Sequence, residues 1–252
     1  MTAQKQILLL SSLIVFSVAS ILFSLLSGSV DISATQLAKG IFSTEPSLNA
    51  QVLQEIRIPR TLAAFVTGGL LALSGAIMQV LLRNPLADPY ILGISGGAAV
   101  GALSAILVGA TGFWLSNAAF VGALSSIFLV FGIANKFGTW SVTRLLLTGV
   151  VVSAGWGAVI NILLTTSSTN NVQSMLFWLM GDLSQSRVNP AHYLLLLVGL
   201  VGGIFISRSL NVLIRGELLA VSLGVNVQSL RLLLFFSASV FTATAVTVAG
   251  SV

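Results

Sequence analysis

The sequence predicts an all-α protein, a polytopic bundle of about seven transmembrane helices with its N-terminus inside. Of the 252 residues, 56% are hydrophobic and only 7% are charged, whereas a soluble domain has about 25% charged residues. The apolar residues form runs of about 20, the length that crosses a bilayer as a helix. Backbone groups in lipid must be paired within their own segment, so these runs must be helical, and no strand-like alternation accompanies them.

Seven apolar runs are the predicted spans, separated by short segments rich in Gly, Pro, Asn and Ser. They cover residues 7–26, 62–82, 91–109, 115–134, 142–165, 192–207 and 232–252. The first run follows Lys5 as the apolar part of a signal peptide would, but its length and the later runs favour a retained helix. We expect residues 1–252 to form a single transmembrane domain.

Local signals support these boundaries and add two shorter helices. Asp88 and Asn189 each precede a proline, which places a capping side chain before the first helical position. Residues 171–181 are apolar but too short to cross the membrane, which favours a helix at the interface. Residues 217–223 lie between two glycines and predict a short helix with a glycine stop.

Small residues recur at four-residue spacing in three of the spans and predict close packing between helices. These residues are Gly68, Ala72 and Ala76; Gly93, Gly97 and Gly101; and Gly149, Ser153 and Gly157. Trp156 lies in the middle of a span, away from the membrane surfaces that indoles prefer, so we expect it to pack between helices.

The distribution of Lys and Arg favours an inner N-terminus, because cytoplasmic segments are enriched in both. The inner segments then hold Lys5, Arg83, Lys136, Arg144, Arg208, Arg215 and Arg231, and the outer segments hold Lys39, Arg57, Arg60 and Arg187. The net charge of +5 is explained by these loop charges. No basic run or aromatic-interleaved patch indicates a nucleic-acid partner.

The sequence lacks the groups that an enzyme or an ion-coupled transporter needs. His192 is the single histidine and there is no cysteine, so neither a metal site nor another cofactor is expected. The six acidic residues all fall in predicted loops or span ends, whereas ion-coupled transporters place such groups inside the membrane. No phosphate-binding loop is present, so an ATP-driven transporter would require a separate ATPase.

An ordered series of short motifs runs through residues 57–252. They are RIPRTL at 57–62, GAIMQ at 75–79, RNPLADP at 83–89, LGISGGA at 92–98, RLLLTG at 144–149, FWLMG at 177–181, GE at 216–217, LGVNV at 223–227 and VAG at 248–250. In this order they resemble the FecCD-type permeases, which import ferric siderophores, haem and cobalamin in bacteria. The resemblance implies a homodimer around a central pore in the inner membrane, two ATP-binding subunits on the cytoplasmic side, and a periplasmic or lipid-anchored substrate-binding protein.

The resemblance also assigns roles to particular residues. It implies binding-protein docking by Arg57 and Arg60, ATPase coupling by Gly216, Glu217, Ala220, Leu223 and Gly224, a cytoplasmic gate at Val142 and Thr143, and a pore lined by Thr148, Ser153, Asn161 and Thr165. Val142 departs from the small hydroxyl residues that some members carry at the gate. Taken from the residues alone, the arginines could equally orient the bundle, the glycine-bounded segment could be an ordinary loop, and the polar groups could bond between helices.

These observations predict the permease subunit of a binding-protein-dependent, ATP-driven importer for a ferric siderophore or a related metal chelate. Cobalamin or haem uptake by the same mechanism is the alternative, and a secondary transporter or passive channel is the candidate from another class. Family members have more spans and both ends inside, whereas seven spans from an inner N-terminus leave the C-terminus outside. We therefore expect C-terminal helices to be missing after residue 252.

Overall fold

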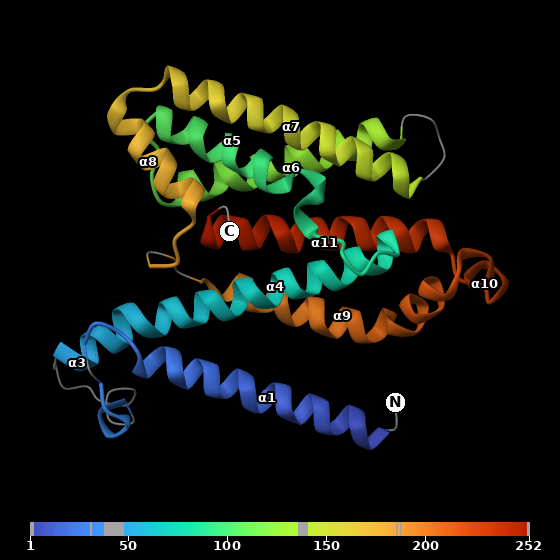
Figure 1. Cartoon of the computed structure of the whole chain (residues 1–252), viewed down its shortest axis with the longest axis horizontal. Coiled ribbons are helices and arrows are strands. Elements are labelled where there is room, and N and C mark those ends of the chain that lie inside the picture. Colours follow the sequence, from blue (N-terminus) through green and yellow to red (C-terminus); the bar gives the residue numbers. More distant parts are fainter. Residues whose placement is uncertain are drawn as a thin grey trace. The chain divides into compact units, whose positions relative to one another are not determined.

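The computed structural model describes residues 3–30, 32–37, 48–135, 141–184, 186 and 188–250, which are mostly helical. Lys39, Lys136 and Arg187, which entered the prediction of orientation, lie outside these ranges. The helices are α1 (Ala3–Leu26), α3 (Leu48–Gln51), η1 (Val52–Arg57), α4 (Ile58–Leu82), η2 (Pro89–Leu92), α5 (Ile94–Leu107), α6 (Phe113–Asn135), α7 (Val142–Thr166), α8 (Thr169–Met180), α9 (Pro190–Arg215), α10 (Glu217–Ser222) and α11 (Val227–Ala249) (Figure 1).

Within the described ranges, six helices are long and apolar enough to cross a membrane. They are Gln4–Leu26, Leu48–Leu82, Phe113–Asn135, Val142–Thr166, Pro190–Arg215 and Val227–Ala249. The predicted third span is present as a shorter apolar helix, Ile94–Leu107. The all-α membrane bundle is thereby confirmed, and so are the two short helices, which appear as α8 and α10.

The second span begins earlier than predicted. α3, η1 and α4 form one helical run of 35 residues, and η1 within it is a π-helix. Within η1, the side chains of Leu53 and Arg57 are buried. The helix therefore continues through the polar residues around them. Such a run is about 52 Å long against a hydrocarbon core of ~30 Å, so its first turns, with Glu55, can lie outside the hydrocarbon.

The third span is shortened by a turn of 3-10 helix, η2. The carboxylate of Asp88 caps this turn by accepting a hydrogen bond from the Tyr90 amide at 2.6 Å, so the predicted cap is confirmed, but it starts η2 instead of the span. Gly93 ends the turn with φ of 69°, a left-handed conformation that favours glycine. The polar backbone between α4 and α5 is thus held in a defined turn.

Contacts between Cα atoms divide the chain into two compact units. Unit 1 is Met1–Ala64 with Ser184–Arg187, and unit 2 is Phe65–Leu183 with Val188–Val252. In unit 1, a small cluster of Leu25, Ile32, Leu37 and Leu53 joins the end of α1 to η1. The apolar window of α1 has no buried residue, as expected for a helix that faces lipid.

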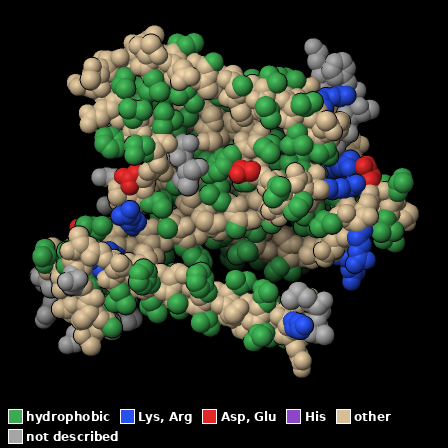
Figure 2. All heavy atoms as spheres, in the orientation of Figure 1, with side chains coloured by type: hydrophobic (Ala, Val, Ile, Leu, Met, Phe, Trp, Pro, Cys, Tyr) green, Lys and Arg blue, Asp and Glu red, His purple; other side chains and the backbone are tan. Residues whose placement is uncertain are grey.

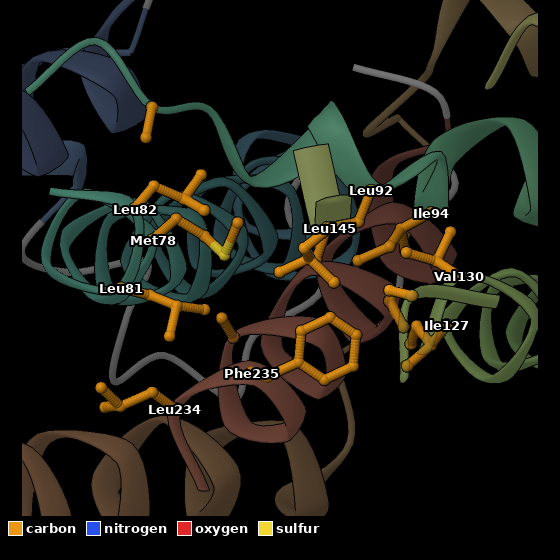
Figure 3. Packing of buried hydrophobic residues seen from close by; sticks show 14 of the residues in the cluster. Met78, Leu81, Leu82, Leu92, Ile94, Ile127, Val130, Leu145, Leu234 and Phe235 are labelled. Carbon is orange, nitrogen blue, oxygen red and sulfur yellow. The ribbon is translucent and has the colours of Figure 1, made fainter. Parts of the chain in front are cut away.

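The core of unit 2 is built around α11. Of its apolar window, 61% is buried, against 39% for the next most buried span. Figure 1 shows α11 between a layer of α5, α6 and α7 and a layer that contains α9. Figure 3 shows the side chains that fill the cluster around it, Met78, Leu81, Leu82, Leu92, Ile94, Ile127, Val130, Leu145, Leu234 and Phe235.

α5 and α6 pack with their backbones in contact, as the small-residue spacing predicted. A methyl group added at Gly97 would lie 2.5 Å from the carbonyl oxygen of Gly122 and 2.7 Å from the Cβ of Ser126. By contrast, a methyl group added at Gly68 or Gly157 would meet no atom within 4 Å. The prediction of close packing therefore holds for the α5 stripe but not for every member of the other two.

Candidate functional site

α10 is a short helix at the end of unit 2 where α9 ends and α11 begins (Figure 1). Gly216 precedes it with φ of 145° and Gly224 follows it with φ of 80°, conformations that side-chain-bearing residues rarely adopt. Ala220 is fully buried, and its carbonyl accepts a hydrogen bond from the Val225 amide at 2.9 Å. These residues of the predicted coupling segment form a tight knob anchored on its inner side.

Glu217, the first residue of α10, forms a two-pronged ion pair with Arg231 near the start of α11. Arg231 Nη1 donates to Glu217 Oε1 at 3.0 Å and Nη2 donates to Oε2 at 2.7 Å. The Arg231 side chain is 10% exposed and that of Glu217 is 47% exposed. From the sequence, Arg231 contributes only to the balance of inner and outer charge, because no helical spacing connects it to Glu217.

The pKa of the Glu217 carboxyl is lowered, chiefly by the hydrogen bonds from Arg231. Burial opposes this effect, and the positive charges of Arg231 and Arg83 add to the lowering. Because the folded-state pKa lies below the unfolded one, the stabilisation from this pair is fully present above the unfolded pKa and is lost as pH falls through the lowered pKa. The pair is therefore intact at neutral pH.

The outward side of α10 and its following residue is apolar. The exposed fractions are 87% for Leu218, 59% for Val221 and 62% for Leu223. Figure 2 shows blue Lys and Arg side chains at the end of unit 2 where α10 lies. α10 itself is not one of the six spans. We call Leu218, Val221 and Leu223 the α10 face.

The predicted gate residues begin α7. Ser141 caps this helix by accepting a hydrogen bond from the Arg144 amide at 3.4 Å, and Arg144 Nη1 donates to the carbonyl of Ala134 at 3.4 Å. Val142 is half-buried and Thr143 is exposed. The hydrogen bond from Arg144 to Ala134 connects the start of α7 to the end of α6.

The four predicted pore-lining residues of α7 do not share one face. Thr148 is buried, and Ser153 faces η2, since a methyl group added at Gly93 would lie 3.0 Å from its Oγ. Asn161 and Thr165 are exposed, and Thr165 Oγ1 donates to the Asn161 carbonyl at 2.7 Å. Of these four residues, only Asn161 and Thr165 are exposed on the surface of the described chain.

Trp156 packs between helices, as predicted. Its Nε1 donates to Ser126 Oγ at 2.9 Å, and Ser126 Oγ donates to the Gly93 carbonyl at 2.8 Å. This chain of hydrogen bonds connects α7, α6 and the end of η2.

His192 also has a structural role, because its Nδ1 accepts a hydrogen bond from the Asn189 amide at 3.1 Å and completes the capping box of α9.

Arg57 and Arg60, the predicted docking pair, lie in unit 1 in very different surroundings. Arg57 is 8% exposed, and its Nη1 donates to the carbonyls of Leu25 and Leu26 at 2.8 and 3.1 Å. Its Nη2 donates to the carbonyl of Val30. Arg57 therefore satisfies carbonyls at and after the end of α1, whereas Arg60 is exposed.

Replacing Arg57 by alanine is expected to lower the free energy of unfolding by about 2–3 kcal/mol, because hydrogen bonds from a charged donor are lost and one buried and two part-buried carbonyls lose this partner. Thermal unfolding of the purified protein in detergent would measure the loss. Arg60→Ala, one helical turn away and exposed, is the matched control and should leave stability within about 0.5 kcal/mol of the parent. Equal effects of the two substitutions would contradict this role for Arg57.

The described residues contain no cluster of three or more His, Cys, Asp or Glu side chains that could hold a metal ion. Over the same residues, no acidic side chain lies in the apolar interior of a span, since Glu55 is in the extension of the second span. The distinctive features of the described site are a short helix between two glycines, an ion pair and exposed apolar side chains.

Comparison with known proteins connects this arrangement to membrane transport. The FecCD transport family model matches residues 14–252. The chain is 40% identical over 210 residues to the cobalamin import system permease protein of Halobacterium salinarum, covering 82% of this chain and 57% of that protein. It is 31% identical over 252 residues to the molybdate import system permease protein of Haemophilus influenzae, covering 97% and 75%.

A solved structure of a metal-chelate type ABC transporter in an inward-facing conformation superposes with a TM-score of 0.81 at 30% identity, covering 97% of this chain and 76% of that one. The hemin transport system permease protein of Yersinia pestis is 36% identical over 77% of this chain. The chain spans 57% and 60% of the lengths of the cobalamin and hemin relatives. Because the family model matches nearly the whole sequence, the chain belongs to the FecCD transport family.

Proposed function

We propose that this chain is the membrane-spanning permease subunit of a binding-protein-dependent, ATP-driven importer that moves a ferric siderophore or a related metal chelate across the inner membrane. The subunit itself hydrolyses nothing. A separate ATP-binding subunit supplies the energy, and the permease converts its motion into movement of the membrane helices.

The α10 face is the observation that supports this proposal best. Three exposed apolar side chains, 59–87% exposed, stand on a short helix that is not one of the six spans. On a helix too short to cross the membrane, neighbouring exposed apolar side chains favour a protein-interaction surface. A short helix with such a surface, connected directly to two membrane helices, suits a partner that moves the membrane domain.

The distribution of charge favours ATP over an ion gradient as the energy source. Transporters driven by ions or protons use ionisable groups within the membrane, where a charge is costly and is kept mainly for function. The interiors of the described spans have no acidic side chain. This supports an external motor and speaks against the secondary transporter, although a passive channel would share the feature.

A second copy of the chain completes the proposed pore. α7 presents exposed apolar residues over much of its length, including Leu147 at 63%, Val151 at 70% and Ile162 at 62%, with Asn161 and Thr165 exposed near its end. In a two-fold dimer each subunit lines half of a single path. Of the four predicted pore residues, we retain Asn161 and Thr165 as lining residues and assign Thr148 and Ser153 to helix packing. The gate role of Val142 and Thr143 remains part of the proposal.

On the outer side we assign docking of the substrate-binding protein to Arg60. Its exposed guanidinium is available for a two-pronged bond with a carboxylate, whereas Arg57 already donates to three carbonyls of its own chain. Charges at the rim of an interface mainly set the rate and register of association. We therefore expect Arg60→Glu to slow capture of the binding protein without loss of stability.

Cobalamin is the second candidate substrate, favoured by the 40% identity to a cobalamin import permease. Relatives are also named for hemin and molybdate, so uptake measurements are needed to identify the substrate.

The test is reconstitution of the complete permease into liposomes with its ATP-binding subunit and binding protein. ATP-dependent uptake of one chelate is expected, and uptake that proceeds equally without the ATPase would reject the proposal.

A further inference from the structure

We infer that Arg231 is a positioning residue that fixes α10 against α11 through its two-pronged bond to Glu217, and so lets the ATP-binding subunit move α11. The inference rests on the proposed function and adds a residue to the coupling segment. It also changes the role of Glu217, which acts inside the chain through Arg231 and not by direct contact with the partner.

α10 cannot hold its own position. It has six residues, whereas isolated helices below about 12 residues are marginal even with favourable sequences. Gly216 and Gly224 flank it, and glycine is the least restricted of the residues. Its orientation therefore depends on side-chain attachments, which among the described residues include the buried Ala220 and the Glu217–Arg231 pair.

The ion pair is suited to this task by its shape. Two parallel hydrogen bonds, at 3.0 and 2.7 Å, join a planar fork to a planar carboxylate and restrict rotation as well as distance. Arg231 is 10% exposed, so its own side chain is held by the core. Arg83 contributes positive charge near Glu217, but the hydrogen bonds are with Arg231.

α11 is the helix through which a displacement of α10 would spread. It is the most buried span of the described chain, and its neighbours include α5, α6 and α9. Interiors are close-packed and transmit strain. A push on the α10 face that is carried into Arg231 would therefore reach the helices that surround the core of unit 2.

A distance measurement tests the inference without any partner. Leu218 on α10 is 87% exposed, and Val108 at the other end of unit 2 is 82% exposed. Because the chain has no cysteine, Leu218→Cys and Val108→Cys would provide the only two sites for spin labels. We expect a narrow distance distribution in the parent and a broad one after Arg231→Gln. Arg208→Gln, which removes an exposed basic side chain from α9, is the control and should leave the distribution narrow.

A second measurement separates coupling from folding. In the reconstituted complex, Arg231→Gln and Glu217→Gln should each lower the uptake per ATP hydrolysed by about tenfold, while the ATP-binding subunit still copurifies. Exchanging the charges, with Glu217→Arg and Arg231→Glu together, should restore most of the ratio. Arg231→Lys, which keeps the charge but not the fork, should give an intermediate value.

A narrow distribution in the labelled Arg231→Gln variant, or an unchanged uptake per ATP, would overturn the inference and leave the proposed function in place. Absence of ATP-dependent uptake in the parent complex would overturn the proposed function, whereas the distance measurement would still report on the ion pair. Loss of copurification together with loss of yield would show that the pair serves folding alone and would also overturn the inference.

Discussion

Replacing Gly122 by alanine is expected to lower the free energy of unfolding by about 3 kcal/mol, the upper range for an overpacked core. The new methyl group would overlap the carbonyl oxygen of Gly97 and lie 3.0 Å from its carbonyl carbon and 3.1 Å from the Cα of Gly101. These are backbone atoms of α5, which cannot rotate away as a side chain can. α6 would have to separate from α5, and the hydrogen bonds of Ser126 to Gly93 and Trp156 would be strained with it.

The measurement is thermal unfolding of the two purified variants in the same detergent. Gly132→Ala on the same helix is the matched control, because a methyl group there meets no atom within 4 Å. Alanine is the better helix former by about 1 kcal/mol, so this variant should be as stable as the parent or more stable. If Gly122→Ala matched Gly132→Ala, the close α5–α6 contact would be wrong.

Replacing Leu218 by aspartate is expected to reduce ATP-dependent uptake at least about tenfold, since truncating or charging a central interface residue costs 2 kcal/mol or more. Leu218 is 87% exposed, so the change should leave the folded subunit intact. If the proposed ATP-binding subunit docks on the α10 face, a charge there would have to be desolvated. Copurification of that subunit from membranes measures the docking, and vesicle uptake measures the consequence.

Val108→Asp is the control for this experiment. Val108 is also apolar and 82% exposed, but it follows α5 at the opposite end of unit 2 (Figure 1). It should affect neither copurification nor uptake. Retention of full uptake by Leu218→Asp would remove the α10 face from the coupling surface.

The sequence predicted the features that depend on neighbouring residues. The glycines around α10 and the Asn189 cap are local signals, and each has its counterpart in the structure. The predicted start of the second span was wrong because Gln54, Glu55 and Arg57 have the composition of a loop. These residues are helical because Leu53 and Arg57 are buried against the end of α1. Local composition does not reveal this burial.

The features that the sequence could not provide depend on residues distant in the chain. Arg231 lies 14 positions from Glu217 with a turn between them, so no helical periodicity connects the two. Likewise, the carbonyl partners of Arg57 lie 27–32 positions away. The inward and outward faces of α7 were unpredictable for another reason: lipid and protein core are both apolar, so hydrophobicity does not distinguish them.

The central place of α11 has a consequence for biogenesis. This helix is synthesised after the other spans that surround it, and synthesis proceeds at only about 5–20 residues per second. Until α11 emerges, α5, α6 and α9 have no partner for the faces that later bury Leu234, Phe235 and Phe241. We expect the earlier helices to remain with the insertion machinery until then, so that a ribosome stalled before residue 227 would leave them open to membrane quality-control proteases.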